Sequence, residues 1–167
     1  MQAVYLDANT ANKADITVNK RTYGRLRFGA GVSSENDKAN HAYIAEGPET
    51  ALSIQSAIPG AQVIAALSVS NISKIRLPEH IKSVTICMDN DGDDAPSVKS
   101  IEKAVKGFIA KGMEVDIVKP EREGMDFNDI LRLEGLSGIK ETLVQHKTNG
   151  ALHQGLRREV IQDIIVN

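Results

Sequence analysis

Strand and helix patterns alternate along this chain between residues 40 and 135. Apolar runs with the length and composition of buried strands occur four times in this region, at residues 42–45, 62–67, 83–88 and 115–118. Between them, apolar positions and helix-start signals predict helices over 48–58 and 95–111, and Asp126 is placed to cap another. Such alternation is typical of an α/β fold, with a mainly parallel sheet flanked by helices.

The two ends of the chain have different patterns. Apolar residues alternate with other residues around Val4 and Ile16, which predicts short strands. Residues 136–167 have a mainly helical pattern. We therefore divide the chain into a small β-rich extension over residues 1–39, an α/β domain over 40–135 and a helical C-terminal segment.

Composition limits the class of protein. The 167 residues are 41% hydrophobic, which is enough for one compact core. The single cysteine, Cys87, lies in a predicted strand, so it can form neither an intrachain disulfide nor a zinc cluster. An uncharged stretch over 50–73 is interrupted by Pro59-Gly60, and the N-terminus lacks the apolar core of a signal peptide. We expect a cytoplasmic protein with no membrane contact.

Positive charge gathers in the N-terminal extension, although the net charge of the chain is −2. Residues 10–33 contain five cations and one carboxylate, with Tyr23 and Phe28 among them. Cations interleaved with aromatic side chains can follow a phosphate backbone and stack on bases. The candidate nucleic-acid-binding residues are Lys20, Arg21, Arg25 and Arg27. An ordinary solvated hairpin with basic side chains is the structural alternative.

An apolar run ends in four carboxylates within six residues, in the segment Asp89-Asn90-Asp91-Gly92-Asp93-Asp94. Because alternate residues of an extended chain point the same way, Asp89 and Asp91 can converge on one cation. Hard oxygen ligands suit Mg²⁺ or Mn²⁺. An acidic turn, with Asp93 or Asp94 as a helix N-cap, is the structural alternative. A calcium EF-hand loop is excluded, because its sixth and twelfth positions hold Asp94 and Ser100.

Parallel strands joined by right-handed crossovers bring further acids to the same edge of the sheet. The acids that follow predicted strands are Glu46, Asp89, Asp91, Asp126 and Asp129. Each carboxylate disfavours ionisation of its neighbours unless a divalent ion neutralises them. Glu46 could complete a metal shell or transfer a proton as a general acid or base. As a structural alternative, Glu46 is stabilised by the amides of a helix start.

The order of these motifs resembles the Toprim domain of bacterial-type primases, topoisomerases and some nucleases. In that pattern one strand ends in Glu-Gly, here Glu46-Gly47, and a later strand ends in Asp-x-Asp, here Asp89-Asn90-Asp91. The segments 48–53 and 126–131 are also similar to the branch found in plasmid and phage primases and in conjugative relaxases. A haloacid dehalogenase phosphatase begins with a similar apolar strand and Asp-x-Asp, but Asp93 stands where its members usually have Thr or Val.

The Toprim resemblance implies a role for each acid. Glu46 would be the catalytic acid or base, and Asp89 and Asp91 would bind Mg²⁺ or Mn²⁺. Asp126 corresponds to a further metal-site acid, and Asp129 would replace the next acid, since Asn128 occupies the expected position.

The activity implied by the resemblance is that of a metal-dependent primase-type nucleotidyltransferase. It would use single-stranded DNA and nucleoside triphosphates in plasmid or phage replication or in conjugative transfer, within a larger protein carrying relaxase or helicase regions. Two alternatives stay open. One is a non-catalytic Toprim module that binds nucleic acid and metal, and the other is a metal-dependent nuclease or phosphoryl hydrolase.

Overall fold

The computed structural model describes residues 2–10, 14–24, 32–34, 36–91 and 97–148. In this part of the chain the central sheet has the strand order β3-β5-β4-β6-β7. Its parallel members are β4 (His41–Ala45), β5 (Gln62–Ala65), β6 (Ser83–Cys87) and β7 (Glu114–Val118). The edge strand β3 (Val32–Ser33) runs antiparallel to β5. The mainly parallel α/β sheet predicted from the sequence is therefore confirmed.

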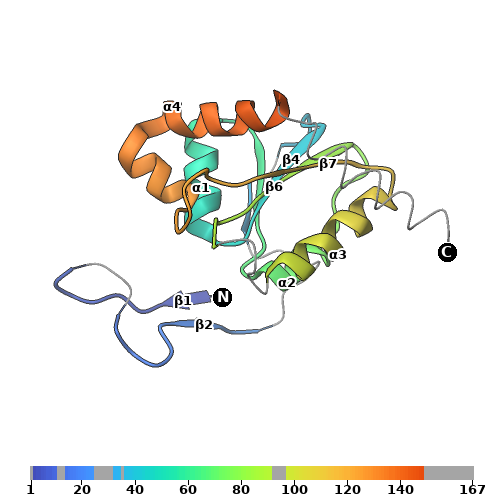
Figure 1. The fold of residues 1–167 in the computed structure, drawn as a ribbon. Coiled ribbons are helices and arrows are strands. Elements are labelled where there is room, and N and C mark those ends of the chain that lie inside the picture. The colour runs from blue at the N-terminus through green and yellow to red at the C-terminus, as the bar shows by residue number, and fades with distance from the viewer. Residues whose placement is uncertain (1, 11–13, 25–31, 35, 92–96, 149–167) are drawn as a thin grey trace.

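Helices cover both faces of the sheet (Figure 1). Those on one face are α1 (Pro48–Ala57) and α4 (Phe127–Thr148), and those on the other are α2 (Val69–Ile72) and α3 (Ser97–Ile109). Helix α4 is kinked at Gly135, whose φ of 71° lies in the left-handed region that glycine adopts without steric cost. The helical pattern predicted after residue 136 is present as far as residue 148.

The core lies in two layers because successive residues of each strand face opposite sides of the sheet. Ile44 and Ile86 pack with Phe108 of α3, whereas Ala45 and Cys87 pack with Phe127 of α4. This burial on both faces explains why the strands read as continuous apolar runs. Truncating either phenylalanine, which is at most 1% exposed, would cost roughly 3–5 kcal/mol.

The N-terminal extension contains an antiparallel ribbon formed by β1 (Gln2–Val4) and β2 (Lys20–Thr22). The strand predicted around Ile16 is wrong in position, since the ladder pairs Val4 with Lys20 instead. The Ile16 side chain is 52% exposed, so its apolar alternation reflects no buried face. No helix among the described residues is long and apolar enough to cross a membrane.

Candidate active site

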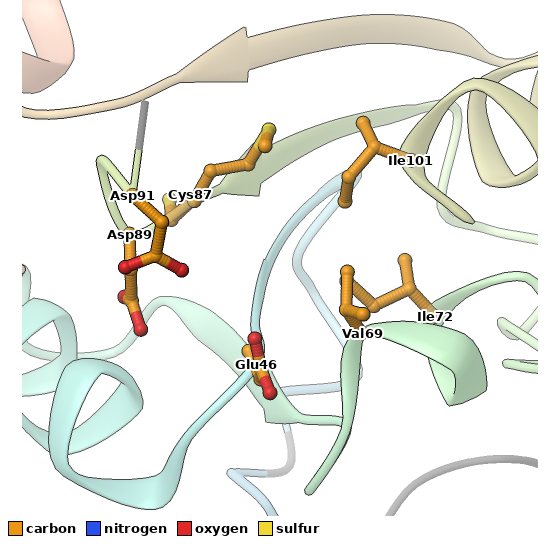
Figure 2. Close-up of a pocket in the computed structure, with 8 residues that line it drawn as sticks. Glu46, Val69, Ile72, Cys87, Asp89, Asp91 and Ile101 are labelled. Carbon is orange, nitrogen blue, oxygen red and sulfur yellow. The ribbon is translucent and has the colours of Figure 1, made fainter. Parts of the chain in front are cut away.

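Three of the predicted acids line one hollow at the carboxyl edge of the sheet (Figure 2). Glu46 follows β4, while Asp89 and Asp91 follow β6. In Figure 2 the two aspartates lie beside each other and Glu46 lies across the hollow from them. The remaining wall is formed by Val69, Ile72, Cys87, Met88 and Ile101. The acids thus share a surface whose other side is apolar.

The turn from β4 into α1 leaves Glu46 at this edge. Gly47 is the N-cap of α1 in an extended conformation, with φ −98° and ψ 156°, and makes no side-chain cap hydrogen bond. Pro48 then occupies the first helical turn, where its fixed φ is favourable and its missing N–H costs nothing. The helix therefore begins two residues after Glu46, and the carboxylate stays at the carboxyl edge of the sheet.

The backbone beside the hollow is strained at Leu67, which follows β5. Its φ of 63° is a left-handed value that costs a non-glycine residue about 1–2 kcal/mol. Burial of its side chain, which is 8% exposed, offsets this cost. The turn leads directly into α2, whose Val69 and Ile72 form part of the wall of the hollow.

Asp89 carries the clearest electrostatic perturbation of the site. Its pKa is raised to about 6, mainly by burial and further by the negative charges of Asp126, Glu46 and Asp91. The Thr50 hydroxyl acts in the opposite direction by donating a hydrogen bond of 3.3 Å to Asp89 Oδ1. Three other carboxylates therefore act on Asp89 at this edge of the sheet.

The raised pKa of Asp89 predicts that the metal-free protein loses stability as the pH rises from about 4 to about 6. The unfolded chain titrates this carboxyl at its ordinary value of 3.8, whereas the folded chain titrates it at about 6. The folded state therefore binds more protons between these values, and this contribution to stability disappears above them. Urea unfolding at pH 4 and pH 7 should show that Asp89→Asn gains stability relative to wild type at the higher pH. An equal difference at both pH values would contradict the assignment.

Asp126 and Asp129 form a reciprocal cap at the start of α4. The backbone N–H of Asp129 donates to Asp126 Oδ1 at 2.8 Å, and the backbone N–H of Asp126 donates to Asp129 Oδ2 at 3.2 Å. The predicted capping role of Asp126 is confirmed. Asp126 also acts electrostatically on Asp89. Asp129, predicted as a metal-site acid, has its carboxylate engaged in stabilising the helix start.

Asn90 is a site residue that the sequence motifs did not reveal. Its side chain is 5% exposed and donates to the carbonyl oxygens of Pro120 and Glu121, at 2.8 and 3.3 Å. Its backbone N–H donates to the Met125 carbonyl, and its carbonyl accepts from Gly124. Asn90 therefore fastens the turn that carries Asp89 and Asp91 to the loop that leads into α4 and Asp126.

The structure describes two of the four basic residues assigned to nucleic-acid binding. Lys20 and Arg21 are consecutive residues of β2, so their side chains project from opposite faces of the ribbon. Arg25 and Arg27 lie outside the described residues, as do Asp93 and Asp94 of the acidic run. The ribbon therefore separates the Lys20 and Arg21 side chains, two of the four cations predicted to bind nucleic acid.

The chemistry of the hollow fits a divalent cation, although its acids are not gathered into a closed shell. In the described part of the chain, no group of three or more His, Cys, Asp or Glu side chains is placed to hold a metal ion. Glu46, Asp89 and Asp91 nevertheless offer hard oxygen ligands on one surface, and burial and mutual repulsion disfavour the ionised form of Asp89. A bound Mg²⁺ or Mn²⁺ would relieve this repulsion.

Comparison with protein families identifies the domain that carries these acids. The family model of the Toprim domain matches residues 41–137, which is more than half of the chain. This chain belongs to the Toprim domain family. The match begins at the first residue of β4 and extends into α4, so this Toprim domain includes all the acids predicted from the sequence. No curated protein matches the chain significantly.

Two solved primase structures have a fold similar to this Toprim domain. A DNA primase domain from Pseudomonas aeruginosa matches with a TM-score of 0.60 and 16% identity, over 81% of this chain and 45% of that one. The Aquifex aeolicus primase, solved with its zinc-binding and RNA polymerase domains, matches with a TM-score of 0.50 and 22% identity, over 64% of this chain and 26% of that one. The match thus spans less than half of either primase chain.

Proposed function

We propose that this Toprim domain is the metal-dependent nucleotidyltransferase core of a primase that acts on single-stranded DNA with nucleoside triphosphates. The observation that carries the proposal is the convergence of Glu46, Asp89 and Asp91 on one hollow, with the charge of Asp126 reaching Asp89. The primase-like fold supports the same reaction class.

The reaction joins a 3′-hydroxyl oxygen to the α-phosphorus of a nucleoside triphosphate. The new phosphorus–oxygen bond replaces the α–β phosphoanhydride bond, and pyrophosphate leaves. Glu46 is the group assigned to accept the hydroxyl proton as a general base, because it faces the aspartate pair across the hollow. Apolar side chains, including Val69, Ile72 and Ile101, form the wall beside it.

The acids that would hold Mg²⁺ or Mn²⁺ are Asp89 and Asp91, with Glu46 and Asp126 beside them. When bound, the ion would neutralise phosphate charge in a site that is otherwise strongly negative. Thr50 orients Asp89 through its hydrogen bond, and Asp129 supports Asp126 through the reciprocal cap. Asp129 is therefore assigned a supporting role in this scheme.

The proposal includes a larger parent protein for replication or conjugative transfer, with relaxase or helicase regions. Its support is the resemblance of the motif order to that of plasmid and phage primases, together with the limited share of each solved primase chain that is matched. Template contacts are assigned to Lys20, Arg21, Arg25 and Arg27, because phosphate contacts supply most sequence-independent affinity.

A second candidate function is a Toprim module that binds nucleic acid without turnover. The observation in its favour is that, among the described residues, no group of three or more His, Cys, Asp or Glu side chains is placed to hold a metal ion. Such a module would retain template affinity through its basic extension.

Incorporation of labelled nucleotides on single-stranded DNA, with and without Mg²⁺, tests the proposed function. We expect Mg²⁺-dependent extension by the intact chain. Binding of the strand with no product would support the non-catalytic module, and Mg²⁺-dependent degradation of the strand would support a nuclease. Either of these results would contradict the nucleotidyltransferase proposal.

Replacing Asp91 by Asn should weaken Mg²⁺ binding by about 10-fold or more, since even the loss of groups that support metal ligands costs 10–100-fold in affinity. Asp91 is exposed, so the folded state should tolerate the change. Calorimetric titration with Mg²⁺ measures the effect, and Glu102→Gln, which alters an exposed acid on α3, is the matched control. Equal affinity in wild type and Asp91→Asn would exclude Asp91 as a ligand.

A further inference from the structure

One face of the N-terminal ribbon carries two tyrosines and an arginine. The ladder pairs Ala3 with Arg21, and the backbone N–H of Tyr5 donates to the Asn19 carbonyl. Because side chains alternate along each strand, Tyr5, Arg21 and Tyr23 project from the same face. Lys20 projects from the other face.

The two tyrosine rings are held together at this face. Their hydroxyl oxygens are 3.3 Å apart, and the two residues are 40% and 45% exposed. The hydrogen bond to Tyr23 is the largest cause of the raised pKa of Tyr5, while the positive charge of Arg21 opposes it, which places Arg21 within electrostatic reach. Two exposed tyrosines and an exposed arginine therefore lie on one face of the ribbon.

We propose that Tyr5, Arg21 and Tyr23 form a stacking face for the bases of single-stranded nucleic acid. The proposal rests on the proposed function, which supplies such a strand, and it names the surface that would hold it. Aromatic rings and guanidinium planes are the groups on which unpaired bases stack, with little dependence on sequence. The three residues lie on a two-stranded ribbon, and the strand register fixes the spacing of their backbone positions.

The positive charge of the N-terminal segment favours nucleic acid as the partner of this face. Residues 10–33 carry five cations and one carboxylate, whereas the chain as a whole has a net charge of −2. A polyanion is therefore attracted to this segment in particular. The carboxylates of an acidic peptide would pair with the cations but would not stack on the rings, whereas every nucleotide of a single strand brings both a phosphate and a base.

Tyrosine fluorescence tests the proposal, because the chain has three tyrosines and no tryptophan. In a Tyr43→Phe background the emission comes from Tyr5 and Tyr23, and oligo-dT added in EDTA should quench it as the bases stack. Replacing both tyrosines by Leu should weaken binding of labelled oligo-dT by about 10-fold or more, from the 1–3 kcal/mol that each stacked base contributes. Replacing both by Phe keeps the rings and should preserve affinity.

Two results would overturn the stacking face. One is equal affinity of the leucine and wild-type chains for oligo-dT. The other is competition by poly-Glu as effective as that of oligo-dT, which would identify a docking site for acidic protein. EDTA makes these outcomes independent of the acid cluster. A chain that binds strand through the tyrosines but incorporates no nucleotide would contradict the proposed function and would support the stacking face.

Discussion

Replacing Glu46 by Gln should reduce nucleotide incorporation about 10²–10⁴-fold, the usual contribution of a positioned general base. The amide keeps the shape of the side chain but cannot accept the hydroxyl proton. Because Glu46 is only partly buried, the variant should fold as wild type does. Steady-state incorporation of labelled nucleotide at saturating Mg²⁺ measures the loss.

Glu49→Gln is the matched control for this variant. Glu49 lies three residues further along, in the first turn of α1, and its side chain is exposed. It loses the same charge from the same end of the helix without facing the hollow, so turnover should change little. Equal turnover in Glu46→Gln and wild type would remove Glu46 from the chemistry and leave it a structural role at the helix start.

Replacing Asn90 by Ala should destabilise the protein by about 1–3 kcal/mol, because the carbonyl of the buried Pro120 loses its donor. The Asn90 side chain is buried, and its amide also donates to the Glu121 carbonyl at 3.3 Å. Each kcal/mol lowers the melting temperature by about 2–4 °C in a chain of this size. Thermal unfolding followed by circular dichroism measures the change.

A double-mutant cycle separates a positioning role of Asn90 from a purely structural one. If Asn90 holds Asp126 near Asp89, then Asp126→Asn should weaken Mg²⁺ binding in wild type and have little further effect in the Asn90→Ala background. Asn71→Ala is the control, because its amide donates to the Ala66 carbonyl and does not contact the loop over 120–125. If Asp126→Asn changes Mg²⁺ affinity equally in all three backgrounds, the role of Asn90 is purely structural.

The arrangement of the parallel sheet could be predicted from sequence because both of its faces are buried. Continuous apolar runs with turn signals between them define strands, and the handedness of crossovers then brings their carboxyl ends together. Glu46, Asp89 and Asp91 could be placed on one edge for that reason. The topology of the sheet, more than any single motif, predicts that these three acids share one hollow.

The remaining features depend on contacts that no local pattern encodes. Asn90 is identifiable as a buried donor only when the loop over 120–125 is seen to pack against it. Asp126 and Asp129 accept reciprocal backbone hydrogen bonds, and what distinguishes them is that the charge of Asp126, but not that of Asp129, contributes to the raised pKa of Asp89. The strand expected near Ile16 failed because an exposed ribbon has no buried face to fix its register.

The most direct test of the metal-dependent site is a crystal of the protein soaked with Mn²⁺ and a nucleoside triphosphate, with the ion located by anomalous scattering. We expect an anomalous peak in the hollow, coordinated by Asp89 and Asp91, with the triphosphate on the side that faces Glu46. Peaks bound elsewhere, or a nucleotide ordered away from these acids with no ion between them, would contradict the assignment.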